Sequence, residues 1–134
     1  CHYAFPLMQK RGGGAVVALT SDAARVPTPS ESVIGGALAA SVMFMKVVAL
    51  EMARFGIRTN VITPSLVSGT DSYDKAMSGE FSRKIFEKIR ERAERQLGLP
   101  APENVAPLAV FFASPLASHI TGQVMTVNGG LSVS

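Results

Sequence analysis

Runs of apolar residues predict three buried strands that are separated by helices. Ala15 to Thr20 and Ile57 to Thr63 are apolar stretches of strand length, and Val124 to Val127 is a shorter one. Continuous apolar runs of this length are typical of strands covered on both faces, as in parallel sheets. Helical patterns lie between them, so the order of elements predicts parallel strands joined by right-handed crossovers.

The longest helical pattern runs from Pro29 to Arg54 and has no polar face. Thr28 suits the N-cap, Pro29 the first turn, and Glu31 the third position of a capping box. A helix that is small or apolar on nearly every side is buried on more than one side. We therefore expect one face on the sheet and another on a partner helix, from the same chain or a second one. The residues that would let a second backbone approach are Gly35, Gly36, Ala37, Ala39, Ala40 and Ser41.

Other segments complete the pattern. Asp74 to Leu97 is an amphipathic helical pattern, and Glu103 to Ala113 is a short apolar one. Tyr3 to Arg11 is interpreted as the end of a helix, stopped by Gly12-Gly13-Gly14. A dinucleotide-binding loop follows a strand and opens a helix, whereas this triple glycine follows a helix and precedes a strand. It is therefore interpreted as a helix-to-strand turn.

Composition excludes several classes of protein. With 134 residues, 47% of them hydrophobic, the chain is one small globular domain or part of a larger one. Its longest apolar stretch, Gly35 to Met45, ends at Lys46, short of the roughly 18–20 residues that cross a bilayer, so no membrane association is expected. The N-terminus lacks the order of a secretory signal, and a cytoplasmic location is expected. Two histidines and the single Cys1 form no metal-ligand cluster.

The net charge of +3 does not predict nucleic-acid binding. Between residues 80 and 95 the basic side chains alternate with glutamates, which is typical of a solvated helix face with i,i+4 pairs. Aromatic residues are not interleaved with these cations, as binding of single-stranded nucleic acid would require.

Three ordered segments resemble the C-terminal half of the short-chain dehydrogenases/reductases. They are GIRTNVITPSLVSGT (56–70), PENVAPLAVFFAS (102–114) and ITGQVMTVNGG (120–130). The resemblance implies a Rossmann-like α/β fold, a doubly wound parallel sheet with helices on both faces. It also implies that residues 1–134 are the C-terminal part of such a domain, without its N-terminal nucleotide-binding half. In that family the helix before the GI-x-x-N strand is the main dimer contact, so a homologous dehydrogenase chain is the expected partner of residues 29–54, in a homo- or hetero-oligomer.

Three strands are few for a doubly wound sheet. The strand at Ala15 to Thr20 would normally have a neighbour on its far side, and an apolar edge left bare promotes aggregation. We therefore expect the missing half of the sheet to be supplied by another segment or lost.

The family places a catalytic Tyr and Lys one turn apart on the long helix, with a Ser 13 residues before the Tyr. Counting back from Gly56 puts the Lys position at Leu38, the Tyr position at Ile34 and the Ser position at Ser21. A phenol, whose pKa is about 10, can exchange a proton only when a nearby cation favours its anion. Ile34 has no proton to exchange and Leu38 has no charge.

No other residue recreates the pair. Tyr3 and Tyr73 are followed four residues later by Leu7 and Met77. Lys46 lies about 12 Å beyond Leu38 along the helix, at ~1.5 Å per residue. The chain is therefore expected to be catalytically silent by itself. Ser21 remains a candidate remnant of the catalytic set, and a turn or cap role is the competing interpretation.

The loop from Pro64 to Thr70 resembles the family's P-G-x-x-x-T segment, whose backbone meets the nicotinamide amide. Here Ser65 replaces the usual Gly, and the Thr comes one residue late. Pro64, Ser65, Val67 and Thr70 are the candidate cofactor-binding residues, on the condition that a complete site exists. NAD or NADP is the cofactor in that case, and none is expected on this chain alone.

Three functions remain open. The first is a non-catalytic subunit or half-domain, a pseudoenzyme that keeps the scaffold for assembly with a competent partner. The second is an active NAD(P)-dependent alcohol or ketone oxidoreductase with atypical catalytic residues, such as Ser21 or Tyr73. The third is a module that holds a nucleotide or an acyl thioester without turning it over.

Overall fold

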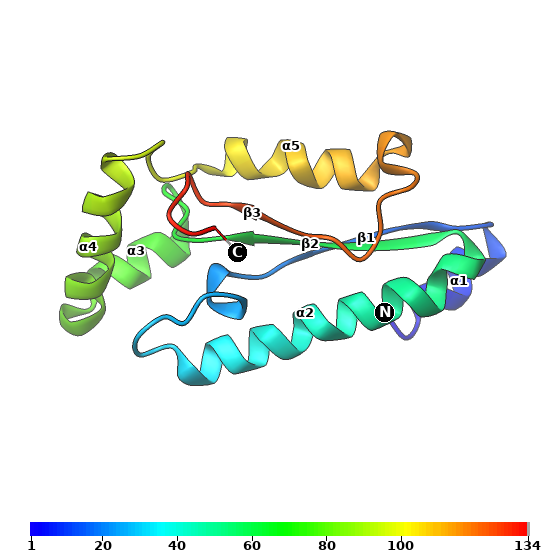
Figure 1. Ribbon diagram of the computed structural model, residues 1–134, viewed down its shortest axis with the longest axis horizontal. Coiled ribbons are helices and arrows are strands. Elements are labelled where there is room, and N and C mark those ends of the chain that lie inside the picture. Colours follow the sequence, from blue (N-terminus) through cyan, green and yellow to red (C-terminus); the bar gives the residue numbers. More distant parts are fainter. Residues whose placement is uncertain (134) are drawn as a thin grey trace.

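The computed structural model describes residues 1–133 and arranges them in three layers, with helices on both faces of one sheet (Figure 1). The strands are β1 (Gly14–Leu19), β2 (Ile57–Pro64) and β3 (Val124–Val127). The helices are α1 (Ala4–Lys10), α2 (Ser32–Met52), α3 (Asp71–Ser78), α4 (Glu80–Glu94) and α5 (Pro102–Ala113). Helix α2 covers one face of the sheet and α5 the other, while α3 and α4 lie beyond the carboxyl ends of the strands (Figure 1).

The sheet is parallel, in the order β1-β2-β3. Gly14 aligns with Ile57, and Val61 aligns with Val124. Strand β2 lies in the centre and is buried along almost its whole length, including the polar residues Thr59, Asn60 and Thr63, as expected of a strand covered on both faces. The predicted Rossmann-like α/β fold is therefore confirmed.

Strand β1 is less buried than β2. It pairs with β2 along one edge, and within residues 1–133 no strand pairs with its other edge. Leu19 at its end is 65% exposed. The second edge of β1 therefore presents unpaired backbone groups beside apolar side chains.

Helix α2 contacts the sheet through one stripe of residues. Val42 and Met45 are buried in a cluster with Val61 of β2. The hydroxyl of Thr59 donates a hydrogen bond to the Met45 carbonyl at 2.8 Å, which fixes the helix along the strand. Six large apolar side chains of α2 are exposed in this chain: Val33, Ile34, Met43, Phe44, Val47 and Leu50.

By length and composition alone, the segment Ser32–Phe55 is apolar enough to cross a membrane. Our expectation that no stretch approaches that length is wrong on this criterion. The single Lys46 interrupts the apolar run but does not lower the mean hydropathy of the helix enough to matter. The indication is weak, because the core helix of a water-soluble protein meets the same criterion.

The predicted start of α2 is wrong. The helix begins at Ser32, and the Glu31 side chain forms no cap. The Glu31 N–H donates to the Thr28 carbonyl at 3.1 Å and the Thr28 hydroxyl donates to the Val26 carbonyl, so these residues form a turn outside the helix. Ser30 has φ 70°, a left-handed conformation that cannot continue a right-handed helix.

Two glycine positions shape the remaining connections. The predicted helix from Asp74 to Leu97 is divided into α3 and α4 at Gly79, whose φ of −82° and ψ of 132° are extended. Gly13 has φ 135°, and a Cβ there would lie 2.5 Å from the Gly56 carbonyl oxygen. The interpretation of the triple glycine as a helix-to-strand turn is confirmed.

Candidate functional site

Polar residues follow the carboxyl end of each strand, at the edge of the sheet where α/β proteins bind ligands. Ser21 and Asp22 come shortly after β1, Ser65 directly follows β2, and Asn128 directly follows β3. Helices α3 and α4 lie next to this edge, whereas α1 and the triple glycine lie at the opposite end (Figure 1). The fold thus brings the predicted Ser21 and the loop after β2 to one side of the molecule.

Asp22 is the buried carboxylate of this edge, with 8% of its surface exposed. Asn128 Nδ2 donates to Asp22 Oδ2 at 2.6 Å, and the Ser132 hydroxyl donates to the same oxygen at 3.1 Å. Asn128 Oδ1 in turn accepts the Gly130 N–H at 3.0 Å. Within residues 1–133, Asp22 Oδ1 has no hydrogen-bond partner. This network joins the loop after β1 to the turn after β3, and the sequence patterns did not predict it.

Ser21 acts as a helix cap in this structure. Its Oγ accepts the Ala23 N–H at 3.3 Å, at the start of a short 3₁₀ turn. This is the geometry of the competing cap interpretation. A substrate contact by Ser21 stays a prediction.

The positions that correspond to the family's Tyr and Lys lie on the first half of α2. Ile34 is 53% exposed and Leu38 is partly buried. The two tyrosines of the chain lie elsewhere, with Tyr3 at the start of α1 and Tyr73 in the first turn of α3. No phenol therefore shares a turn of α2 with an ammonium group.

The loop after β2 is held by its own contacts. The hydroxyl of Thr70 donates to the Val67 carbonyl at 2.9 Å and accepts the Tyr73 N–H at 3.2 Å, as the N-cap of α3. Val67 packs against the cluster under α5, and Pro64 is buried as the last residue of β2. Of the four candidate cofactor residues, Ser65 lines one of the two cavities described below, and Pro64, Val67 and Thr70 line neither.

That cavity has a volume of about 480 Å³ and lies between α4 and the ends of the strands. Its lining is largely apolar, and three cations from α4 reach it at i, i+4 and i+8. The alternation of cations and glutamates predicts a solvated face here, and the four-residue spacing of these three cations is the sequence signal for the cavity. The lining residues are Asp22, Val26, Pro27, Thr28, Pro29, Ser65, Lys84, Ile85, Lys88, Ile89, Arg92, Leu131 and Ser132.

A second cavity, of about 510 Å³, lies beside the start of α2. The Pro27–Pro29 segment borders this cavity and the first one. Glu31 lines it, and burial raises the pKa of the Glu31 carboxyl. Within residues 1–133, no cluster of three or more His, Cys, Asp or Glu side chains could hold a metal ion.

Comparisons with known proteins identify the family. The profile described as "Enoyl-(Acyl carrier protein) reductase" matches residues 1–132. Human "Dehydrogenase/reductase SDR family member 4" is 36% identical over 125 residues, which are 93% of this chain and 43% of that protein. This chain belongs to the short-chain dehydrogenases/reductases. The 7alpha-hydroxysteroid dehydrogenase of Escherichia coli (strain K12) is 31% identical over 125 residues, 93% of this chain and 47% of that relative.

Solved structures of short-chain dehydrogenases/reductases share the fold. One is 7 alpha-hydroxysteroid dehydrogenase in complex with NADH and 7-oxo glycochenodeoxycholic acid, which has a TM-score of 0.83 and 28% identity. The match covers 96% of this chain and 48% of that one. A short-chain dehydrogenase/reductase from Mycobacterium ulcerans matches with a TM-score of 0.81 and 28% identity, over 97% of this chain and 46% of that one. The chain thus spans about half the length of these relatives.

The described residues do not fit a nicotinamide dinucleotide by themselves. The Thr70 hydroxyl is engaged as a helix cap, and Leu38 offers no donor to a ribose hydroxyl. The triple glycine precedes β1 and Ser65 follows β2, so they lie at opposite ends of the parallel sheet. No catalytic step through such a cofactor follows from these residues.

Proposed function

We propose that this chain is a non-catalytic short-chain dehydrogenase/reductase subunit or half-domain, which supports assembly with a catalytically competent homologous chain. The observation that supports the proposal is the chemistry of α2 at Ile34 and Leu38. Neither side chain can exchange a proton or carry a charge, and both tyrosines lie outside α2. Acid–base assistance, typically a factor of roughly 10² to 10⁴ in rate, is therefore missing.

The exposed apolar face of α2 supports the assembly part of the proposal. Phe44, Val47 and Leu50 present large apolar side chains to solvent on the side of the helix away from the sheet. Contiguous exposed apolar patches mark interaction surfaces, and burying such a patch stabilises a complex by about 25 cal/mol per Å² of apolar area. A helix of a homologous chain has the length and apolar character to cover this face.

A second candidate function is an active NAD(P)-dependent alcohol or ketone oxidoreductase with relocated catalytic residues. The cavity beside Ser65 favours it, because Lys84 and Lys88 supply ammonium groups at the ligand-binding edge of the sheet. In that case NAD or NADP binds only when a complete site is formed.

One assay separates these functions. The chain is incubated alone, and then with its homologous partner, with NADH or NADPH and a ketone such as 7-oxo glycochenodeoxycholic acid. We expect no oxidation of the nicotinamide by the chain alone, and turnover by the assembly only while the partner keeps its Tyr. Turnover by an assembly with the partner's Tyr removed, lost again on Ser21→Ala in this chain, would contradict the proposal.

A double substitution tests the absence of the catalytic pair directly. Ile34→Tyr with Leu38→Lys restores the phenol and the ammonium group on α2. We expect no turnover from this variant alone, because residues 1–133 do not form a dinucleotide site. Turnover by the double variant would show that nucleotide binding is intact and that only the two side chains were lacking.

A further inference from the structure

The cavity beneath α4 combines an apolar interior with a one-sided distribution of charge. Ile85 and Ile89 of α4 face it from one side and Leu131 from another, while Val26 and the prolines of the 26–29 segment close a third. An enclosure of this kind, about 480 Å³ in volume, suits the apolar body of a small molecule.

Three cations border this interior. Lys84, Lys88 and Arg92 stand one turn apart on α4 and all line the cavity. A spacing of four residues places them in one row on the helix surface. Among residues 1–133, Asp22 is the only acidic residue that lines the same cavity, and its Oδ2 accepts hydrogen bonds from Asn128 and Ser132.

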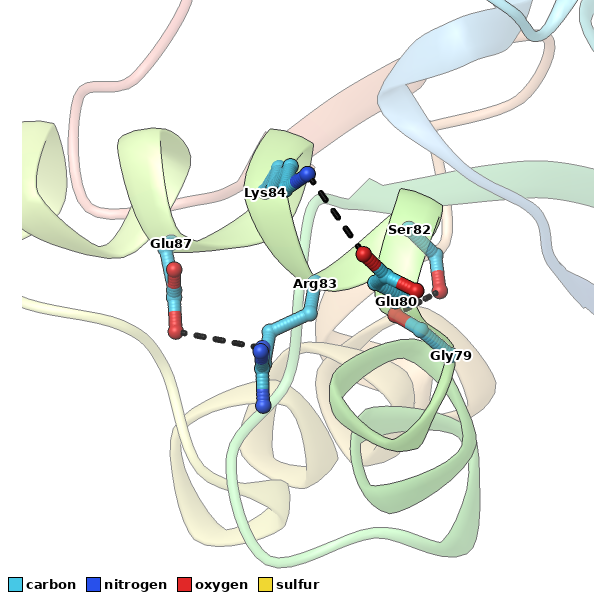
Figure 2. A network of polar contacts seen from close by, with 6 residues as sticks. All are labelled: Gly79, Glu80, Ser82, Arg83, Lys84 and Glu87. Atoms are coloured by element: carbon cyan, nitrogen blue, oxygen red, sulfur yellow. Dashed lines mark hydrogen bonds and ion pairs between the residues drawn. The ribbon is translucent and has the colours of Figure 1, made fainter.

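Ion pairs within α4 leave two of these cations for a ligand. Figure 2 shows Arg83 directed toward Glu87, with Nε to Oε1 at 3.7 Å, and Lys84 directed toward Glu80, also at 3.7 Å. Arg90 pairs with Glu94 in the same manner. In the described part of the chain, Lys88 and Arg92 form no ion pair. Three cations therefore face one carboxylate across the cavity, and two of the three have no counter-ion.

We propose that this cavity binds a small amphipathic anion. Its apolar body lies between Ile85, Ile89 and Leu131, and its carboxylate or phosphate accepts hydrogen bonds from Lys88 and Arg92. Arg92 is suited to either group, because a guanidinium presents paired donors to two oxygens. The proposal concerns binding, so it holds whether or not the chain turns a substrate over.

The test compares three probes that share one apolar tail: octanoate, octyl phosphate and octan-1-ol. Amide chemical-shift titration of the 134-residue chain gives the dissociation constant of each probe and the residues that respond. We expect the anions to bind about tenfold more tightly than the alcohol, since each partly exposed charge contact contributes a factor of roughly 2 to 5. The preference should shrink in high salt, because screening weakens it. Comparing octanoate with octyl phosphate distinguishes a carboxylate site from a phosphate site.

Two double variants, each of which removes two positive charges, test whether the anion binds at Lys88 and Arg92. Lys88→Gln with Arg92→Gln removes the two unpaired cavity cations, whereas Lys75→Gln with Arg95→Gln removes one cation from α3 and one from the end of α4, outside the lining. We expect the first variant to bind octanoate no more tightly than octan-1-ol, and the second to bind as the parent does. If both variants lost octanoate affinity equally, the preference for anions would come from the net charge of the chain and not from this cavity, and the proposal would be overturned. An unmodified chain that binds octanoate no better than octan-1-ol would overturn it without any variant.

Discussion

Asn128 connects distant parts of the chain through one buried carboxylate. Its Nδ2 donates to Asp22 at 2.6 Å and to the Ser132 hydroxyl at 2.8 Å, and only 4% of its surface is exposed. An amide is suited to this place because its N–H donates a hydrogen bond to a carboxylate that is buried away from water. A second carboxylate at position 128 would bring two like charges together where solvent cannot screen them.

Asn128→Asp is therefore expected to lower the free energy of unfolding at pH 7 by roughly 2–4 kcal/mol. Part of the loss should return on acidification, when one proton is shared between the two carboxyl groups. Urea unfolding at several pH values measures both effects. Asn104→Asp is the matched control, because Asn104 is exposed in the first turn of α5, where a carboxylate also accepts the Ala101 N–H. Similar losses in the two variants would contradict the buried-charge argument.

Glu31 places two opposing effects on one carboxyl group. It is the N-cap residue of α2, where the helix dipole favours a negative charge, yet burial raises its pKa above the ordinary value of 4.5. The folded state therefore binds this proton more readily than the unfolded state does. The ionised carboxylate costs stability once the pH is above the raised pKa, and the cost disappears below about pH 4.5, where both states are protonated.

Glu31→Gln should then stabilise the chain at neutral pH, and its advantage over the parent should fade as the pH approaches 4.5. Thermal unfolding from acidic to neutral pH follows this difference. Destabilisation at pH 7 would mean that the helix dipole outweighs burial at this position.

The connection between α1 and β1 depends on a close approach of two backbones. A Cβ on Gly13 would lie 2.5 Å from the Gly56 carbonyl oxygen, whereas a Cβ on Gly12 would meet nothing within 4 Å. Both glycines have positive φ, but 135° at Gly13 lies farther from the left-handed helical region than 83° at Gly12, so Gly13 is the more demanding position in backbone conformation as well as in contact. The Gly14 N–H donates to the same Gly56 carbonyl, at the first step of the β1–β2 pairing.

Gly13→Ala should accordingly destabilise the fold more than Gly12→Ala. The positive φ costs roughly 1–3 kcal/mol for an alanine, and the cost is larger at Gly13 than at Gly12. The clash in Gly13→Ala adds about 1–3 kcal/mol, because the β2 backbone cannot move away without breaking the sheet. Denaturant midpoints of the two variants give the comparison. Equal midpoints would show that the turn can shift to accommodate the added methyl group without loss of stability.

Elements with a strong local signal could be predicted from the sequence, and features that depend on distant residues could not. The apolar runs of β1, β2 and β3 were placed within a residue or two, because burial on both faces requires such runs. The predicted start of α2 was wrong because Ser30 adopts a left-handed conformation, which its residue type does not predict. The pairing of Asp22 with Asn128 follows only from the sheet, since the two residues are 106 positions apart.

The candidate site was predicted in part. A family pattern fixes the spacing of Ser21 and Ser65 from Gly56; Ser65 lines the cavity, whereas Ser21 lines neither cavity and its substrate contact stays a prediction. The cation row of α4 was overlooked, because a mixture of Lys, Arg and Glu has the same composition on a solvated helix as beside a cavity. Only the position of α4 across from the strand ends separates Lys88 and Arg92 from the basic residues that surround them.

At the scale of the whole molecule, α2 has one face on the sheet and one face in solvent. Gly36 lies on this helix, and a Cβ there would meet no other atom of the chain within 4 Å. A side chain added at this position therefore finds open space within the chain at its Cβ, and it would alter the contact that we propose for a partner. Gly35 is unsuitable for this purpose, because its Cβ would lie 2.9 Å from the Ala23 carbonyl oxygen.

Gly36→Leu should have opposite effects on folding and on assembly. The chain itself gains helix propensity, about 0.8 kcal/mol relative to glycine, while a closely packed partner loses roughly 1–3 kcal/mol to the added volume. Sedimentation velocity measures assembly and thermal unfolding of the dissociated chain measures stability. Gly36→Ala is the control, since it gains the same propensity and stays small. If Gly36→Leu assembles as the parent does, partners do not pack closely on α2 at this residue.

The order of strands in the sheet is the order in which a ribosome makes them. Strand β2 can pair with β1 as soon as it emerges, but its other edge waits for β3, whose first residue lies 60 positions after Pro64. At about 5–20 residues per second, that wait is roughly 3–12 s. For this time the strand that is most buried in the folded chain has an open edge, so translation speed between residues 64 and 124 governs its exposure to chaperones and to aggregation.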